Sequence, residues 1–419
     1  MTMNYKMETL KNELKSELTE NILPFWLKMS DPEGGFWGRM DGKGNVHKES
    51  CKGAVMTARI LWTFSAAYRL IGNEIYLRAA TRGKREIIDR FYDREHGGVY
   101  WSIDSSGSPL DTKKQIYALG FAIYGLSEYC RATGDKEALD YAVRLYEDIE
   151  KHSFDYRKNG YYEAFDREWN IIEDMRLSDK DANESKTMNT HLHIIEPYTN
   201  LYRVWKSDEL KDRIDNLITL FTDKFTDSDS GHLRLFFDND WICKSDIISY
   251  GHDIEAAWLL YEAGSLIYDK ENESDAMTRL VKSTTKTITA ASEGFFPNGG
   301  MIYEMELSSG KIDADRHWWV QAETITGYVY QALIPGELYL AAGFPDSGKK
   351  HIANSLSKAF DCWEFTKKHI IDHRDGEWFW SLKADGTANT DDDKAGFWKC
   401  TYHNGRMCIE IIEKLENLR

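Results

Sequence analysis

The sequence repeats one short unit six times. In each copy a glycine is followed within two residues by apolar side chains, most of them aromatic, as in GGVYW at 97–101 and GEWFW at 376–380. Successive copies are 63, 62, 71, 69 and 76 residues apart. A period of this kind indicates a repeat architecture, and each step has room for two helices and a connecting hairpin. The glycines are Gly35, Gly98, Gly160, Gly231, Gly300 and Gly376.

Helical spacing of apolar residues dominates the chain between these units. Six segments are apolar and rich in Ala and Tyr, which is typical of helices buried on most sides. They are 50–71, 113–133, 186–205, 251–269, 317–342 and 402–418. Six more charged segments alternate with them and are expected to be outer helices. They are 8–29, 74–91, 135–153, 207–225, 272–293 and 346–370. Six inner and six outer helices predict an all-α (α/α)6 barrel, with residues 1–419 as one domain and the two chain ends packed together.

The glycine-aromatic units are predicted to be short β-hairpins. They alternate in strand fashion and end in turn residues such as Asp41-Gly42. Each would join an outer helix to the next inner helix, so all would lie on one face of the ring, where the inner helices begin. Loops on one end of a rigid scaffold commonly carry the active site. Pro197 and Pro335 fall within predicted inner helices and are expected to kink them.

Charge and composition exclude several classes of partner. The chain carries 53 Lys and Arg against 69 Asp and Glu, a net charge of −16, with no basic cluster. Nucleic acid and anionic membranes are therefore not expected partners. The first twenty residues are charged, and no apolar run approaches the roughly 20 residues of a membrane span. The six cysteines show no CxxC spacing, which favours reduced thiols and a cytoplasmic protein.

One reactive or aromatic residue follows each repeat glycine by about 20 to 30 positions and opens or lies near the start of each inner helix. A closed ring of helices would direct all six toward one central pocket, the arrangement expected of an enzyme that acts on a small polar molecule. These residues are Arg59, Tyr117, His193, His252, Trp318 and His403.

The three histidines have informative neighbours. Asn189 and His193 are four residues apart and share a helical face, whereas His191 points elsewhere. His252 and Glu255 are three residues apart, so the carboxylate can contact the imidazole, fix its tautomer and raise its pKa. A single buried histidine is more often structural than catalytic. Three at equivalent positions of a predicted ring favour a functional site.

The chemistry that fits these residues is proton transfer at carbon. Two histidines can remove a proton from one face of a carbon and return it to the other. The required acidity exists only next to a carbonyl, so a sugar ring would have to open first. Arg59, in an apolar helix, would need a core acid or a substrate oxygen as partner, and could stabilise an enediolate. A phosphate loop and a dinucleotide fingerprint are both lacking, so we expect no cofactor.

Four motifs together resemble the N-acylglucosamine 2-epimerase superfamily over essentially the whole chain. They are His193, SYGHDIE at 249–255, RHWWVQAE at 316–323 and YHNGR at 402–406. Within the superfamily they are most similar to the cellobiose 2-epimerase branch, because Gln321 stands where the other branches usually carry histidine.

The resemblance implies roles for individual residues. His252 and His403 would be an acid/base pair acting on two faces of C2, and His193 with Asn189 would assist ring opening and binding. Arg59 would bind the enediolate and Glu255 would orient His252. The substrate would be a disaccharide such as cellobiose, lactose or mannobiose, converted by a monomer without cofactor or metal. The subsites would be shaped by Tyr117, Trp318, Trp319, Glu323 and Trp398.

Other functions remain open at this stage. The nearest are an N-acylglucosamine 2-epimerase and an aldose–ketose (mannose) isomerase, which would use the same enediolate. An inverting glycoside hydrolase would instead need two carboxylates, with Glu163, Asp253, Glu255 and Glu323 as candidates. A zinc site built from the three histidines would be sensitive to chelators. A non-catalytic toroid would bind sugars without turnover.

Overall fold

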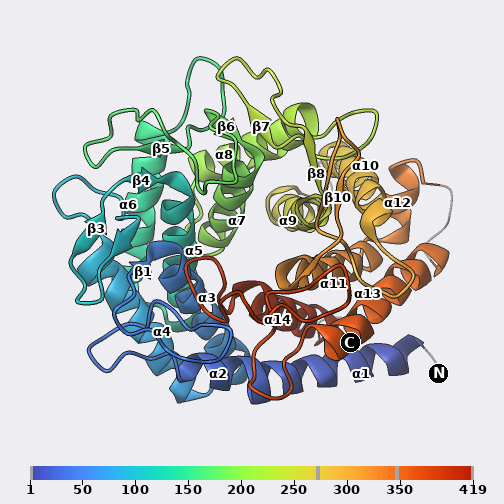
Figure 1. Ribbon diagram of the computed structural model, residues 1–419. Coiled ribbons are helices and arrows are strands. Elements are labelled where there is room, and N and C mark those ends of the chain that lie inside the picture. The colour runs from blue at the N-terminus through green and yellow to red at the C-terminus, as the bar shows by residue number, and fades with distance from the viewer. Residues whose placement is uncertain (1–2, 270–273, 345–348, 417–419) are drawn as a thin grey trace.

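The computed structural model describes residues 3–269, 274–344 and 349–416, with side chains described except at 3, 4 and 349. Two concentric rings of helices surround a central axis, as Figure 1 shows. The inner ring is α3 (Ala54–Ile71), α5 (Ile116–Thr133), α7 (Met188–Val204), α9 (Tyr250–Ile267), α11 (Trp318–Ala332) and α14 (Tyr402–Glu416). This arrangement confirms the predicted (α/α)6 barrel.

The outer ring alternates with the inner one along the chain. It starts with α1 (Met3–Ser16), which packs against α14 and thereby joins the first and last parts of the barrel. It continues through the π-helical turn η1 (Glu17–Ile22) into α2 (Leu23–Leu27). The other outer helices are α4 (Glu74–Glu86) with η2 (Ile87–Phe91), α6 (Lys136–His152), α8 (Asp208–Leu220) with η3 (Phe221–Phe225), α10 (Ser274–Ala291) with η4 (Ser292–Gly294), and α13 (Lys349–His369).

In five of the six copies the repeat glycine lies in a turn that an aspartate closes. In the second copy, Asp93 accepts hydrogen bonds from the backbone N–H groups of Glu95 and His96, and Gly98 has φ of 66°. A residue with a side chain rarely adopts this conformation, which explains the glycine. The flanking residues Tyr92 and Val99 form an antiparallel bridge. The repeated glycine in the sequence therefore marks a tight turn.

The strands differ from the predicted local hairpins in one respect: they also connect neighbouring repeats. The strand before each inner helix pairs antiparallel with the hairpin of the next repeat. The pairs are β1 (Lys52–Gly53) with β2 (Ser102–Ile103), β4 (Lys114–Gln115) with β5 (Ala164–Phe165), β6 (Lys186–Thr187) with β7 (Phe236–Phe237), β8 (Ile247–Ser249) with β9 (Glu304–Glu306), and β11 (Arg316–His317) with β12 (Ser381–Leu382). A bridge between Met40 and Ala395 links the first and last hairpins. Strands β3 (Pro109–Asp111) and β10 (Ile312–Asp313) extend two of the sheets.

Buried lysines lock these strands to the glycine turns. Lys114, in the strand before α5, places Nζ 3.0 Å from the carboxylate of Asp93. Lys186 and Asp155 repeat this contact at 2.9 Å. A buried charge is tolerated only when it is paired and hydrogen-bonded, so each pair fixes the start of an inner helix relative to the preceding turn. The start of the helix is where the candidate residues lie.

Two prolines act differently in the inner helices. Pro197 lies inside α7, and His193, four residues earlier, has non-helical φ and ψ of −91° and 18°. Proline has no N–H to bond to the carbonyl of His193, so the predicted kink is confirmed at this residue. The predicted helix 317–342 is wrong as one piece: α11 ends at Ala332, and Pro335 caps a separate short helix, α12 (Gly336–Ala341). Parts of the predicted helices at 272–273, 346–348 and 417–418 lie outside the described residues.

Among the described residues, the model contains no helix that is both long enough and apolar enough to cross a membrane.

Candidate active site

A cavity of about 460 Å³ lies at the face where the inner helices begin. Ten of the eleven residues singled out from the sequence line it. The remaining residue, Glu323, lies behind His403. The ten are Arg59, Tyr117, Asn189, His193, His252, Glu255, Trp318, Trp319, Trp398 and His403. Tyr303, His317, Trp380 and the loop 177–181 complete the wall.

A second cavity of about 290 Å³ adjoins the first. The two share His252 and Asn189, so the outer cavity continues directly from the inner one. Acidic residues outnumber basic ones in its wall. They include Asp181, Glu304 and Asp313. The combined space suits a polar molecule longer than one sugar ring.

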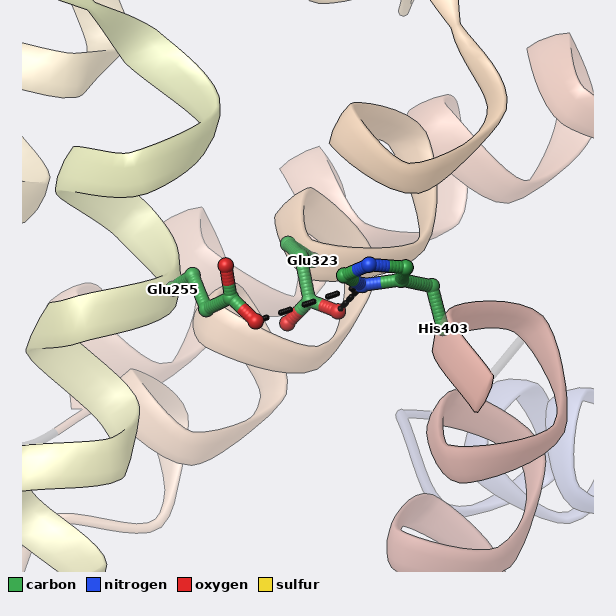
Figure 2. A group of neighbouring side chains, drawn as sticks. All are labelled: Glu255, Glu323 and His403. Carbon is green, nitrogen blue, oxygen red and sulfur yellow. Dashed lines mark hydrogen bonds and ion pairs between the residues drawn. The ribbon is translucent and has the colours of Figure 1, made fainter. Parts of the chain in front are cut away.

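His403 is held by a carboxylate of the neighbouring helix, as Figure 2 shows. Its Nδ1 lies 2.7 Å from Oε1 of Glu323, whose other oxygen accepts a 2.9 Å hydrogen bond from the indole of Trp258. Burial, with the charges of Arg59 and Arg406, lowers the pKa of His403 well below its usual value. The imidazole is therefore neutral, donates Nδ1–H to Glu323 and keeps a lone pair on Nε2.

Arg406 is the centre of a buried ionic cluster at the floor of the cavity. It donates 2.7 Å hydrogen bonds to Oε1 of Glu255 and to Oε1 of Glu323, and it also pairs with Glu196. Burial and the nearby Glu323 raise the pKa of Glu255 to about 8. Three carboxylates thus surround one guanidinium, and the proton affinity of each depends on the others.

Glu196 holds His193, and the sequence analysis missed it. Nδ1 of His193 lies 3.0 Å from Oε2 of Glu196, whose other oxygen accepts a hydrogen bond of 2.5 Å from the hydroxyl of Tyr402. Burial opposes ionisation of Glu196, but the ion pair with Arg406 prevails and lowers the pKa of this carboxyl to about 2. The signal was present: His193 and Glu196 have the same spacing of three residues as His252 and Glu255.

His252 does not have the partner expected for it. Its Nδ1 lies 2.8 Å from the hydroxyl of Ser249, whereas Glu255 contacts Arg406 and lies 3.9 Å from Nδ1 of His403. The contact expected between Glu255 and His252 is therefore not made, and the side chain at Nδ1 of His252 is Ser249. The reason is that Arg406 competes for the carboxylate. Burial, with the charge of His193, lowers the pKa of His252 to about 3.

Trp319 contacts both candidate acid/base residues. Its ring centroid lies 4.9 Å from that of His252 and 5.6 Å from that of His403. The two imidazoles come from α9 and α14, and Trp319 comes from α11 between them. The indole therefore fixes the spacing of the two histidines at one cavity.

Arg59 lies between aromatic rings. Its guanidinium is 4.1 Å from the ring centroid of Phe121 and donates a 2.7 Å hydrogen bond to the hydroxyl of Tyr117. A further hydrogen bond of 3.3 Å goes to the carbonyl of Trp398. Among the described residues, no carboxylate forms an ion pair with Arg59. Its positive charge is therefore available to an anionic oxygen in the cavity.

Three buried polar atoms of cavity residues have no hydrogen-bond partner within the described part of the chain. They are Nε of Arg59, Oδ1 of Asn189 and Nε1 of Trp318. Buried polar groups are normally satisfied, so such atoms around a cavity indicate a hydrogen-bonding ligand.

Three other candidates serve the hairpins and do not line the cavity. His191 accepts a 2.9 Å hydrogen bond at Nε2 from the backbone N–H of Tyr161, as expected for a side chain that points away from His193. Asp253 accepts a 2.8 Å hydrogen bond from the N–H of Leu233. Gln321 accepts one of 2.9 Å from the N–H of Met301. All three accept from a backbone N–H one or two residues after a repeat glycine, so their role is structural.

Glu255, Glu323 and His403 have the spacing of a metal site, since one ligand atom of each lies within 4.8 Å of the others. Arg406 donates hydrogen bonds to both glutamates, however, and supplies a positive charge at this position. The donor set therefore suits a guanidinium better than a divalent ion.

Comparison with known proteins extends over the whole barrel. The family model described as N-acylglucosamine 2-epimerase matches residues 35–405. A cellobiose 2-epimerase of Bacteroides fragilis is 59% identical over 407 residues, covering 97% of this chain and 99% of that protein. One from Ruminococcus albus is 38% identical, covering 96% and 98%. The solved structure of a cellobiose 2-epimerase from Bacillus thermoamylovorans superposes with a TM-score of 0.87 at 40% identity, covering 97% and 100%.

Proposed function

This chain belongs to the N-acylglucosamine 2-epimerase family and is a carbohydrate epimerase, and we propose that it acts on the reducing end of β-1,4-linked disaccharides. The reaction reversibly converts the glucose residue at that end into mannose, without a cofactor. Cellobiose, lactose and mannobiose are the substrates to consider. The relatives that share more than a third of its residues over nearly its full length support this choice.

One observation of the site carries the proposal. His403 is buried and His252 is half-buried; both imidazoles are neutral, contact Trp319 and line one cavity. A neutral imidazole can accept a proton, and its conjugate acid can return one. Two such groups beside one carbon are what inversion at that carbon requires.

The reaction begins with opening of the sugar ring, because the C2 proton becomes acidic only beside the C1 carbonyl. His193 and the unpaired amide oxygen of Asn189 assist at the ring oxygen and hydroxyls. Arg59 binds the oxygen that gains negative charge, and it does so at low cost because its guanidinium is already buried and ordered.

The proton transfers then balance over one turnover. One histidine of the pair takes the C2 proton, and the electrons of the C–H bond move into a C1–C2 double bond as the carbonyl becomes an enediolate. The other histidine must first have taken a proton from bulk water on Nε2; it gives this proton to the opposite face of C2, and the carbonyl reforms. The ring closes on the epimer. Bulk water resets the protons of the two imidazoles.

The second sugar lies in the outer cavity, and the tryptophans 318, 319, 380 and 398 supply apolar surfaces for sugar rings. The small disaccharide is the expected partner. We further propose a cytoplasmic monomer that binds neither nucleic acid nor membranes. All six cysteine thiols are free, as is typical of a reducing compartment.

A competing hydrolase would need two free carboxylates. Glu163 accepts hydrogen bonds from Thr187 and Thr190, and Glu255 and Glu323 share Arg406. These carboxylates already bond to other groups of the protein, and this favours the epimerase over the hydrolase. An aldose–ketose isomerase is the nearer alternative to the proposed epimerase, since it uses the same enediolate and returns the proton at C1.

The test is incubation of the purified protein with cellobiose in D2O with EDTA, followed by proton NMR. A mannose-type reducing end that carries deuterium at C2 is the expected result, and it would also count against a catalytic metal. Release of free glucose would support the hydrolase. A ketose as the main product would support the isomerase. The absence of any conversion would contradict the proposal.

A further inference from the structure

Ser249 occupies a helix-capping position but does not cap its helix. It is the residue before α9, where the hydroxyl of a serine usually accepts a hydrogen bond from a backbone N–H of the first turn. In this structure the Ser249 side chain makes no such bond, and Oγ lies 2.8 Å from Nδ1 of His252. A conventional cap would stabilise the helix by about 1 kcal/mol.

The equivalent position of α7 shows the usual behaviour. Thr187 precedes α7, and its hydroxyl accepts a 3.1 Å hydrogen bond from the N–H of Thr190. On the outer helix α8, Ser207 accepts one of 3.4 Å from Leu210. The residues before α3, α5 and α11 make no side-chain cap either, but they are Gly53, Gln115 and His317. Ser249 differs from Thr187 and Ser207 because its hydroxyl lies against a cavity imidazole.

The three cavity histidines also differ in their partners. His193 contacts the carboxylate of Glu196 and His403 contacts that of Glu323, whereas His252 contacts a neutral hydroxyl. A carboxylate stabilises an imidazolium, but a hydroxyl acts chiefly on the orientation and the tautomer of the ring. The indole of Trp319 also contacts this ring. Ser249 is 3% exposed, so its hydroxyl has little access to water as an alternative partner.

We propose that Ser249 is a positioning residue that accepts Nδ1–H of His252 and so leaves the lone pair of Nε2 for the substrate. The inference rests on the proposed function, because only proton abstraction requires that lone pair. It accounts for the lost helix cap, since the hydroxyl cannot serve both groups in this geometry. The two neighbours of the ring then have separate roles. Trp319 fixes the position of the ring, and Ser249 fixes which nitrogen carries the proton.

The test compares Ser249→Ala with Ser249→Thr, which keeps a hydroxyl, and with Ser207→Ala as a matched control at a cap on the outer ring. The tautomer of His252 is read from long-range ¹H–¹⁵N spectra of ligand-free protein with labelled histidine. His252→Asn identifies the signal. We expect wild type to show Nδ1–H, Ser249→Ala to show Nε2–H or a mixture, and Ser249→Thr to restore the wild-type spectrum.

Turnover of cellobiose gives the second readout. We expect kcat of Ser249→Ala to fall by about 10- to 100-fold, by analogy with the loss of hydrogen-bond partners that orient metal-bound imidazoles, with KM within about twofold. Ser207→Ala should lower Tm and leave kcat unchanged, whereas Ser249→Ala should leave Tm close to wild type. An unchanged tautomer in Ser249→Ala, or a kcat within twofold of wild type, would overturn the proposal.

The two readouts separate this proposal from the proposed function. The tautomer is measured without substrate, so it tests the contact even if wild type fails to convert cellobiose. Failure of wild type in the D2O experiment contradicts the function. A normal wild type with an unaltered Ser249→Ala variant contradicts only the role of Ser249.

Discussion

Glu323 holds His403 through the same carboxylate oxygen that accepts a hydrogen bond from Arg406, with both distances 2.7 Å. His403 and Arg406 are three residues apart on α14, so one face of this helix contacts Glu323 twice. The ion pair with Arg406 reduces the pull of the carboxylate on the imidazole proton. His403 can thus be oriented by a carboxylate and still remain neutral, as a base must.

The first prediction concerns the histidines. His403→Asn and His252→Asn should each lower kcat for formation of the epimer from cellobiose by at least about 1,000-fold, because each removes one of the two proton-transfer groups. Initial rates by NMR in D2O measure this effect. A carboxylate-pair hydrolase would be little affected by the same changes.

His191→Asn is the matched control for these variants. His191 bonds the N–H of Tyr161 and lies 2.7 Å from the carbonyl of Thr187, away from the cavity. Its loss leaves buried backbone groups unsatisfied and should cost about 1–3 kcal/mol of stability for each group, with kcat near wild type. A His191→Asn variant that is stable but inactive would contradict the structural role.

The second prediction concerns Arg406. Arg406→Met removes the positive charge from between Glu196, Glu255 and Glu323, and should lower the free energy of unfolding by about 3–5 kcal/mol. Urea unfolding followed by tryptophan fluorescence measures this change.

A double variant separates charge from packing. Glu196→Gln in the Arg406→Met background removes one of the unpaired charges and should recover part of the lost stability. The same substitution in wild type should destabilise, because it breaks the ion pair and weakens the contact with His193. If the two changes were additive, the electrostatic account of the cluster would be wrong.

Much of the architecture could be predicted because its cause is local. Five of the six repeat glycines, Gly98 among them, have positive φ, and the period of the glycines gives the number of helix pairs. The reactive residues could be found because the barrel aligns the starts of the inner helices. The pairing of β1 with β2 across two repeats could not be predicted, since it depends on how neighbouring repeats pack.

The partners of the site residues were harder to predict. Helical spacing correctly places Glu255 near the cavity, but the choice between His252 and Arg406 depends on α14, which lies about 150 residues further along the chain. Glu196 was missed because it lies past the kink at His193. Ser249 lies in the motif SYGHDIE, but a serine before a helix is expected to cap it, so the contact with His252 was not predicted.

The third prediction uses the buried Glu163. Burial raises its pKa from 4.5 to about 8, so the folded protein keeps a proton that the unfolded chain releases between these values. Stability should therefore fall as pH rises from about 5 to 8, by up to about 1.4 kcal/mol per pH unit from this group. Glu163→Gln removes the contribution, while its amide can still bond to Thr187 and Thr190.

Urea unfolding at pH 5, 6.5 and 8 tests this effect. The stability of Glu163→Gln relative to wild type should increase with pH, and its epimerase activity should persist. Glu184→Gln, nearer the surface, should follow wild type in parallel. If the stability of Glu163→Gln also changed with pH in parallel with that of wild type, Glu163 would already be ionised in the folded protein.

The last prediction follows from the charge of the outer cavity. Its wall carries six acidic residues besides Glu163, against two basic ones, Arg176 and Lys180. Burial raises the pKa of Glu304 to about 6, so this residue is also ionised at pH 8. The acidic residues are Asp181, Glu184, Glu304, Asp313, Asp315 and Asp392.

A disaccharide with glucuronate in place of the non-reducing glucose should therefore be a poor substrate, with kcat/KM about tenfold below that of cellobiose at low salt. Because salt shortens the screening length from about 10 Å at 0.1 M to about 3 Å at 1 M, the difference should shrink as NaCl is added. Glu304→Gln should reduce the difference in kcat/KM between the two substrates at low salt. Lactose, which is neutral, provides the control, and its ratio to cellobiose should not change with salt. A glucuronate substrate whose relative rate is indifferent to both salt and Glu304→Gln would show that the second sugar lies away from this wall.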